Sequence, residues 1–533
     1  MTSSVGGEPA ERWYEPAGPD EGDPSAAWPS GGHLADPPAA VLARHNARVL
    51  AAGRHGAAAS TVYRADVLLV PGDLPRLHPE LFDTEPDALD GQLNVLLADS
   101  GLYLTRMDEV MASASAAASD SASDEPAAIT LLLRQLSDRR PDERPARLPE
   151  LELDAALALR YLRLAARDTP LADAVAEIGL DHLLFATTGI GGMPITEGHP
   201  ITEGHGDPGR VPVAVVGPPP ARRTRARVRG GRRPVVAVLD TAVRPHPWFE
   251  EGADPFHVDA TTRGWQPGPG TPPKETTGVS DPLIGTLDSH AGHGTFIAGI
   301  VRQIAGDATV LSMHLMHGDG VVYESHLCNA LNHLYQEVST GDPHRFVDVV
   351  ILALGYHVEN ANDAAFTGVL GKALARLGQC GVLVVASAGN DATSRPTYPA
   401  ALAAAAKRPL TPLVSVGSLN PNGVRATYSN TATWVTDWDR GTGVVSTLPP
   451  FNGSLSPALS VPAKVAGVAR ASLDPDDFTG RFARWTGTSF AAAVFAARVT
   501  QKIISVAGKD ALLATDPTSA SQRVEAALAA CRS

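Results

Sequence analysis

Five uninterrupted apolar runs, separated by stretches with helical periodicity, constrain the fold of this chain more than any other feature. Strands that are buried on both faces read as continuous apolar runs, and parallel strands need a crossover helix between them. The helical stretches include 325–338 and 363–378. The apolar runs are 234–240, 308–316, 346–354, 381–389 and 412–419. The second half of the chain is therefore predicted to be an α/β fold with a doubly wound, mostly parallel sheet.

The region before residue 190 has a different pattern. Its segments follow the order β-α-β-β-α-β, which is the split βαβ arrangement of ferredoxin-like domains. The expected strands are 64–73, 101–108, 127–136 and 180–188, and the expected helices are 88–101 and 150–168. We predict an α+β ferredoxin-like domain over residues 59–190.

The remaining segments are predicted to lie outside folded domains. Residues 1–58 are rich in Pro, Gly, Ala and acidic residues, which indicates a disordered tail. Residues 191–233 form a Gly/Pro/Arg-rich linker that holds the unit PITEGH twice in tandem and then seven arginines. The repeat is interpreted as a duplicated flexible linker rather than a metal clip, because Gly and Pro give the ligands no rigid frame. The arginine run is interpreted as a solvated linker, with a nucleic-acid patch or a cleavable hinge as alternatives. The last domain is predicted to span 234–533.

Composition excludes several classes of protein. A net charge of −14 argues against a nucleic-acid-binding chain, and no run approaches the ~18 apolar residues of a membrane span. The first residues lack the basic and apolar regions of a signal peptide. The three cysteines are odd in number and far apart, which favours a reducing compartment. We therefore predict a cytoplasmic protein with no nucleic-acid or membrane partner.

Four polar residues stand where strands end or helices begin. Asp240 ends the first apolar run, His293 begins a helical run of small residues, Asn390 follows the fourth apolar run, and Ser489 begins an Ala-rich helix. Each has an ordinary explanation by itself, as a helix cap, a plain histidine or a turn former.

Together the same four residues supply a complete set of groups for acyl transfer. A serine hydroxyl needs an imidazole to take its proton and a carboxylate to hold that imidazole, and the tetrahedral intermediate needs hydrogen-bond donors. A serine at a helix N-terminus also lies at the positive end of the helix dipole. The chain order Asp, His, Ser separates the subtilisin arrangement from those of chymotrypsin and the α/β-hydrolases.

Residues 234 to about 505 resemble subtilisin-family serine peptidases over several motifs. These motifs are VAVLDTAV, GHGTFIAG, LALGY, ASAGND and GTSFAAAV. The resemblance implies catalytic roles for Asp240, His293 and Ser489 and an oxyanion-hole role for Asn390. It also implies that the substrate contacts Leu354, Gly355, Ala388, Gly389 and Thr397.

Two positions differ from the family pattern, and each difference leads to a prediction. The family usually has Gly where Ala242 stands, so Ala242 must adopt a backbone conformation that glycine adopts more easily. Thr397 occupies a position that often carries Gly at the base of the specificity pocket. We therefore expect a shallow pocket and a small or medium side chain on the residue before the cleaved bond.

The resemblance implies a serine endopeptidase that works through an acyl-enzyme intermediate, and we expect it to process a specific intracellular protein or peptide. Many relatives carry an N-terminal propeptide, so 59–190 is predicted to be a propeptide-like inhibitory domain, with a partner-binding domain as the alternative. Other hypotheses are a catalytically restrained regulatory or peptide-binding protein, and an esterase or peptide ligase. No cofactor is expected to be needed for catalysis. Calcium stabilises many relatives, but no residue set here is assigned to it and no metal ligand is predicted.

Overall fold

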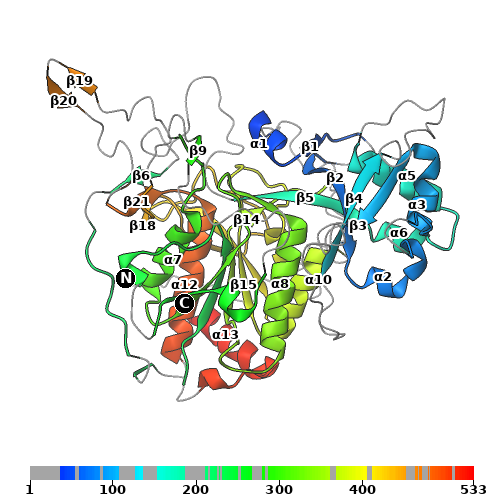
Figure 1. Cartoon of the computed structure of the whole chain (residues 1–533). Helices are drawn as coiled ribbons and strands as arrows, with labels where there is room; N and C mark the ends of the chain where they lie inside the picture. The colour runs from blue at the N-terminus through cyan, green and yellow to red at the C-terminus, as the bar shows by residue number, and fades with distance from the viewer. Residues whose placement is uncertain are drawn as a thin grey trace, which may run out of the picture. The chain divides into compact units, whose positions relative to one another are not determined.

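The protein is described here by a computed structural model, shown in Figure 1. The described residues are 37–54, 59–84, 88–106, 127–135, 153–186, 210–213, 216–224, 227–228, 231–249, 254–266, 279–281, 286–359, 368–404, 411–451, 463–465, 467–470, 478, 480–506 and 511–532. The PITEGH repeat and residues 1–36 lie outside them.

A parallel sheet of seven strands forms the centre of the second half of the chain, residues 234–533, here called the peptidase-like half after the motifs it contains; the strand order is β17-β16-β15-β13-β7-β11-β8. Every neighbouring pair in it is parallel. The strands are β7 (Val235–Asp240), β8 (His257–Asp259), β11 (Thr309–His314), β13 (Val349–Leu352), β15 (Leu383–Ser387), β16 (Leu413–Leu419) and β17 (Asp437–Arg440). The five apolar runs thus contain five of these strands, and the predicted α/β parallel sheet is confirmed.

Helices cover both faces of this sheet (Figure 1). Val236 and Val238 of β7 pack on one side with α7, α12 and α13, whereas Val235 and Ala237 pack on the other with α8 and α10. This double burial explains why the strands are apolar at every position rather than at alternate ones. The helices are α7 (His293–Ile304), α8 (Glu324–Ser339), α10 (Val369–Gln379), α12 (Thr488–Val506) and α13 (Pro517–Arg532).

A second sheet of seven strands is built mainly by the N-terminal part of the chain. Four of its strands follow the order β5-β2-β4-β3, with every neighbouring pair antiparallel. These strands are β2 (Thr61–Pro71), β3 (Leu102–Arg106), β4 (Ala128–Gln135) and β5 (Gly179–Ala186), and the helices α3 (Gln92–Leu97) and α5 (Ala155–Ala166) lie between them in sequence. Asp154 caps α5 by accepting hydrogen bonds from Ala156 N and Leu157 N.

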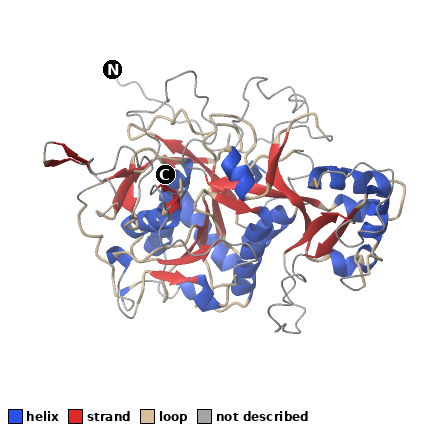
Figure 2. Ribbon diagram, turned by 45° about the horizontal axis from the view of Figure 1, so that its top comes forward, coloured by secondary structure: helices blue, strands red, loops and turns tan. Residues whose placement is uncertain are grey.

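The sheet does not end at β5. It continues through β12 (Val321–Tyr323) and β14 (Leu354–Gly355), which belong to the peptidase-like sequence. Strand β5 therefore joins the N-terminal strands to two segments of the other half, and Figure 2 shows these strands in red.

Besides several 3-10 turns, the described structure also holds shorter α-helices and strands. They are α1 (Ala39–Arg44), α2 (Leu74–Leu77), α6 (Ala172–Ala176), β1 (Ala47–Leu50), β6 (Val211–Pro212), β9 (Val279–Asp281), β10 (Thr286–Leu287), β18 (Val444–Thr447), β19 (Ala463–Val465), β20 (Val468–Arg470) and β21 (Phe482–Trp485).

Two segments differ from the sequence-based expectation. Residues 39–50 were predicted as part of the disordered tail, but they form α1 and β1, because β1 pairs with β2 and His45 hydrogen-bonds to Tyr323 and Asp319. The arginine run was expected to be solvated. Arg232 and Arg233 are instead buried in ion pairs with Asp348 and Asp254.

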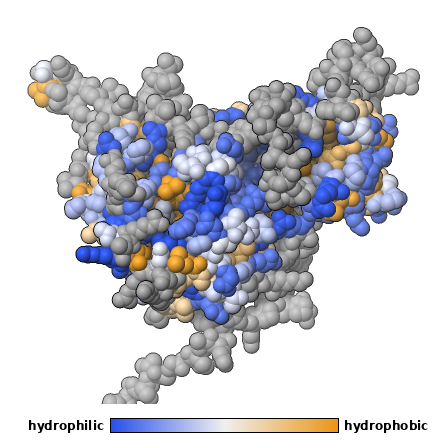
Figure 3. Space-filling model, turned by 60° about the horizontal axis from the view of Figure 1, so that its bottom comes forward, coloured by the Kyte–Doolittle hydropathy of each residue, from blue (hydrophilic) through white to orange (hydrophobic). Residues whose placement is uncertain are grey.

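The surface in Figure 3 carries mainly hydrophilic residues, with hydrophobic residues in small separate groups. Within the described ranges, no helix combines the length and apolar character that crossing a bilayer requires.

Candidate active site

Asp240 and His293 form a buried pair at the carboxyl end of the parallel sheet. Asp240 is the last residue of β7, and His293 is the first residue of α7. Both carboxylate oxygens lie 2.8 Å from His293 Nδ1. One of them also accepts a hydrogen bond from Thr241 N at 2.7 Å. Donation from Nδ1 to Asp240 leaves Nε2 as the ring nitrogen that can accept a hydrogen bond.

Ser489 lies at the second position of α12, and the residue after it packs against the same histidine. The ring of the next residue, Phe490, has its centroid 5.4 Å from that of His293. Ser489 Oγ donates a hydrogen bond of 3.2 Å to Ala353 O. His293 Nε2 is buried and makes no hydrogen bond to any residue that the structure describes. In this structure the Ser489 hydroxyl is therefore directed at Ala353 O and not at His293 Nε2.

Asn390 contacts the turn that leads into α12. Its Oδ1 accepts hydrogen bonds from Thr488 N at 3.0 Å and from Thr488 Oγ1 at 2.9 Å. The Thr488 hydroxyl in turn accepts one from Gly389 N at 3.1 Å. These contacts fix the orientation of the Asn390 amide, with Oδ1 towards the start of α12. The donor group, Nδ2, therefore does not face Thr488.

Aromatic rings and one arginine enclose the histidine. Trp485 meets His293 edge-on, with ring centroids 5.6 Å apart. The guanidinium of Arg210 lies 5.1 Å from the Trp485 ring and donates hydrogen bonds to Ala291 O and Asp288 O, just before His293. Asp240, His293 and Ser489 are accordingly 1%, 0% and 0% exposed.

The predicted substrate-binding edge at Leu354 and Gly355 is occupied. These residues form β14, and β5 pairs with them in antiparallel register, with Ala186 opposite Leu354 and Phe185 opposite Gly355. The other edge of β5 pairs with β12, where Val321 lies opposite Phe185. A segment from the N-terminal part therefore lies as an added strand in the slot between β12 and β14, here called the strand slot.

The other predicted pocket residues lie next to one another. Asn430 Nδ2 donates hydrogen bonds of 3.0 Å to Ala388 O and to Thr397 Oγ1. Gly389 has φ +105°, and a Cβ there would lie 2.3 Å from Asn430 Nδ2. Glycine is therefore required at position 389. That Thr397 makes the specificity pocket shallow stays a prediction.

Ala242 adopts the left-handed conformation that its position suggested. Its φ is +38°, and its N–H donates to Asp240 O at 3.1 Å. Gly294 of α7 packs against this turn, because a Cβ there would lie 3.1 Å from Ala242 O. The turn after Asp240 thus carries strain that a glycine would relieve.

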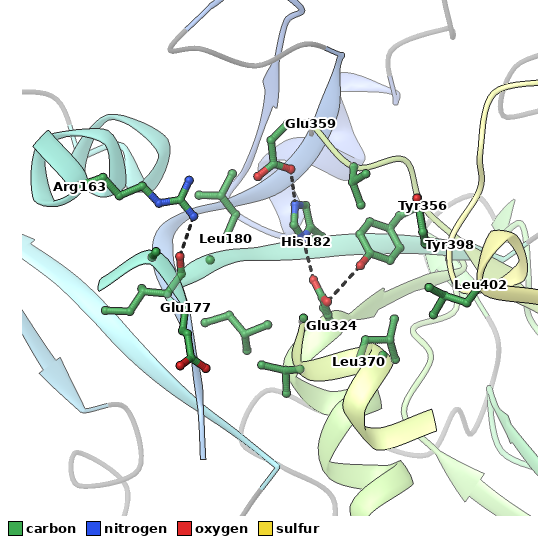
Figure 4. Close-up of a pocket in the computed structure, with 18 residues that line it drawn as sticks. Arg163, Glu177, Leu180, His182, Glu324, Tyr356, Glu359, Leu370, Tyr398 and Leu402 are labelled. Carbon is green, nitrogen blue, oxygen red and sulfur yellow. Dashed lines mark hydrogen bonds and ion pairs between the residues drawn. The ribbon is translucent and has the colours of Figure 1, made fainter. Parts of the chain in front are cut away.

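Sequence reasoning missed one group of buried charges beside the strand slot. His182 of β5 lies between two carboxylates, with Nδ1 2.6 Å from Glu324 and Nε2 2.8 Å from Glu359, while Tyr356 donates to Glu324 at 3.0 Å (Figure 4). Burial, the largest influence, lowers the pKa of His182, but the attraction of Glu359 and Glu324 outweighs it and raises that pKa to about 10. His182 is more than a hundred residues from either glutamate in sequence, so no local pattern could reveal these contacts.

Among the described residues, no group of three or more His, Cys, Asp or Glu side chains is arranged to hold a metal ion. Catalysis without a cofactor stays a prediction, and calcium, which stabilises many relatives, stays without an assigned residue set.

Comparison with known proteins decides the family. Residues 231–520, more than half of the chain, match the model of the subtilase family, peptidase S8. The chain belongs to the subtilase family. No curated protein matches it. Among solved structures, this subtilase is similar to a cold adapted subtilisin-like serine proteinase, at 19% identity over 54% of this chain and 79% of that one, with a TM-score of 0.33.

Membership of this family makes the chain a serine endopeptidase, as the sequence motifs predicted. The four predicted residues come together at the carboxyl end of the subtilase sheet. Asp240 bonds to His293, the His293 ring contacts Phe490 next to Ser489, and Asn390 bonds to Thr488 just before Ser489.

Proposed function

We propose that Asp240, His293 and Ser489 form the catalytic triad of this subtilase, with Asn390 as an oxyanion donor. His293 Nε2 takes the proton of Ser489 as Oγ bonds to the scissile carbonyl carbon. The Asn390 amide and the N-terminus of α12 stabilise the negative oxygen that develops. His293 then protonates the leaving amine, and water hydrolyses the acyl-enzyme by the reverse sequence of proton transfers.

We also propose that residues 59–190 are a propeptide-like inhibitory domain that folds as a ferredoxin-like unit. The observation that carries this proposal is the antiparallel pairing of β5 between β12 and β14. Leu184 and Ala186 on this strand are packed into the same hydrophobic core as Leu354 and Val322 of the peptidase half. A substrate needs the same backbone edges, so β5 excludes it while it stays in place.

The expected site of self-cleavage follows from where the chain is anchored. Ala186 lies opposite Leu354, next to the carbonyl that Ser489 contacts, and Arg210 lies on Trp485 beside His293. Arg222 and Arg223 are also held, by Ala308 O and by Asp307. We therefore place the cut between Ala186 and Arg210.

Intact-mass analysis of the purified full chain tests both proposals. Wild type is expected to split between residues 186 and 210, whereas Ser489→Ala stays whole. If neither splits, a fluorophosphonate probe is added to both proteins. Labelling of wild type alone means an active peptidase whose N-terminal part is permanent, and overturns the self-cleavage proposal.

Absence of labelling in both proteins would overturn the catalytic proposal. It would favour a catalytically restrained, peptide-binding protein, which agrees with the hydrogen bond of Ser489 to Ala353 and the lack of one at His293 Nε2 among the described residues. Hydrolysis of esters but not of peptides would favour an esterase.

We propose that the substrate is a specific polypeptide inside the cell. Support comes from Cys328, Cys380 and Cys531, all of which are free thiols and suit a reducing compartment. Fractionation of the producing cells, followed by immunodetection of the chain, tests this location.

A further inference from the structure

Beside the strand slot, the peptidase half presents two carboxylates to a cation that it does not itself supply. Glu324 is 5% exposed and begins α8, and Glu359 lies a few residues after β14. The described residues that line the adjoining cavity from this half include both glutamates, Tyr356 and Tyr398, and none of them is Arg, Lys or His. The cation between the carboxylates is His182, which comes from β5.

We infer that Glu324 and Glu359 form a specificity subsite that selects a basic side chain in the substrate, three residues before the residue that pairs with Gly355. This inference rests on the proposed function, because β5 is taken to lie where a substrate strand lies. His182 stands three residues before Phe185, the residue opposite Gly355.

The alternation of side chains along β5 supports the assignment. Residues two apart in a strand point to the same face. His182 reaches the two glutamates, and Leu184 and Ala186 are packed in the core of the peptidase half, whereas Leu183 packs in a separate small cluster with Val321 and Tyr323. A substrate strand in this register therefore presents a basic, an aliphatic and a small side chain to the peptidase at alternate positions.

The electrostatics of the subsite favour a full positive charge. Burial raises the pKa of Glu359, but the charge and hydrogen bond of His182 outweigh burial and lower that pKa to about 2. The ring of Tyr356 lies 4.9 Å from that of His182, and its hydroxyl is hydrogen-bonded to Glu324. A neutral side chain would leave the buried Glu324 and the partly buried Glu359 without the ion pairs that His182 makes with them, which is costly.

The adjoining cavity allows a side chain longer than histidine. Its volume is about 320 Å³, and it is lined on the N-terminal side by Arg163, Glu177 and Leu180 (Figure 4). A guanidinium offers several donors in a planar fork that matches carboxylates, so arginine is the preferred residue for this subsite.

A neighbouring contact adds a second feature to the expected substrate. Asp181 accepts hydrogen bonds from Ser325 N at 2.9 Å and from Ser325 Oγ at 3.0 Å, at the start of α8. The N-cap residue of this helix, Tyr323, makes no side-chain capping bond. An acidic residue directly before the basic one therefore caps α8 from the substrate strand.

Hydrogen exchange in the full chain is the first arm of the test. Amide exchange at β12 and β14 is measured for wild type, His182→Gln and His182→Arg. Exchange is expected to be about tenfold faster in His182→Gln and near the wild-type rate in His182→Arg. A hydrogen bond to a charged group lowers the equilibrium constant for opening by about tenfold or more, and only the Gln variant loses that bond. Unchanged exchange in His182→Gln would overturn the inference, because removal of the cation would then have cost nothing.

The second arm measures how well added peptides compete with β5 for the strand slot. The full chain with His182→Gln and Ser489→Ala receives fluorescein-labelled peptides of sequence 179–186 that carry Arg, Gln or Glu at the 182 position. By fluorescence anisotropy, the Arg peptide is expected to bind about tenfold more tightly than the Gln peptide and the Glu peptide most weakly. The preference should disappear when Glu324→Gln and Glu359→Gln are added.

Equal binding of the Arg and Gln peptides, or a preference that persists without the two glutamates, would overturn the inference. Neither arm uses catalysis. Failure of the proposed function would be seen separately, as absence of fluorophosphonate labelling of wild type at Ser489.

Discussion

The side-chain carbonyl of Asn390 accepts two hydrogen bonds from Thr488, one from the backbone N–H at 3.0 Å and one from the hydroxyl at 2.9 Å. Thr488 directly precedes Ser489, so the proposed oxyanion donor and the proposed nucleophile are held by one residue. The Thr488 hydroxyl also accepts a hydrogen bond from Gly389 N, a residue of the predicted pocket wall. Thr488 therefore connects Asn390 and Ser489 to that wall.

Thr488→Val should therefore lower kcat by about tenfold with little change in KM, because it removes the hydroxyl that orients Asn390 while the backbone bond remains. Asn390→Ala should cost more, about 10²- to 10³-fold in kcat, since it removes the donor itself. Steady-state hydrolysis of a fluorogenic peptide with the sequence of residues 179–190 measures both effects.

The matched control for these variants is Thr500→Val. Thr500 is buried in the same helix, and its hydroxyl bonds to Ala496 O, far along α12 from Ser489. Its kcat should equal that of wild type. A rise in KM without a fall in kcat for Thr488→Val would contradict the positioning role.

Ala242→Gly should stabilise the protein. Ala242 has φ +38°, a region that costs a residue with a Cβ about 1 kcal/mol or more, and glycine adopts it freely. The melting temperature is expected to rise by about 2 °C in a scanning calorimetry or dye-binding experiment.

The comparison for this variant is Ala237→Gly, in the middle of β7. Ala237 is buried in the sheet, so the same chemical change should there lower the melting temperature. A fall of similar size in both variants would mean that the backbone at Ala242 is not strained.

Arg232→Met should destabilise the chain by about 3 kcal/mol, because it removes the two short hydrogen bonds to the buried Asp348 carboxylate and leaves only the longer ion pair with Arg523, at 3.6 Å. Arg232 donates to both carboxylate oxygens of Asp348, at 2.6 and 2.9 Å, and both residues are buried. Urea unfolding followed by circular dichroism gives the free energy of unfolding.

Arg227→Met is the control for this pair, since Arg227 belongs to the same arginine run but is exposed. It should change the free energy of unfolding by less than about 0.5 kcal/mol. Comparable losses in the two variants would show that the run acts as a whole rather than through the Asp348 pair.

The stabilisation by His182 should depend on pH in a defined direction. Its pKa in the folded protein, about 10, is higher than the ordinary 6.5, so its contribution is complete below about pH 6.5 and is lost as pH rises through 10. The pKa of Glu359, about 2 against an ordinary 4.5, makes the contribution of that group fall as pH drops through 2. The difference in melting temperature between wild type and His182→Gln should therefore be larger at pH 6 than at pH 10.

His344→Gln provides the surface comparison for this series, because His344 is exposed. It should leave the melting temperature close to that of wild type at each pH. If the difference in melting temperature between wild type and His182→Gln grows towards pH 10, His182 is not held as a buried imidazolium.

The amino-acid sequence by itself determined the parallel sheet and the four residues at its edge. Strands buried on both faces must be apolar throughout, so β7, β11 and β15 were visible as runs. Asp240 and Ser489 stand at a strand end and a helix start, where short local motifs identify them.

Only the tertiary structure decided what occupies the strand slot and which charges lie beside it. His182 is 142 residues from Glu324 and 177 from Glu359, and Arg232 is 116 residues from Asp348. Contacts over such distances leave no periodic pattern in the chain, because each residue's local sequence is compatible with an exposed position. The contacts of His182 are fixed when β5 pairs with β12 and β14, and that of Arg232 when β7 pairs with β13, because burial requires every charge to have a partner.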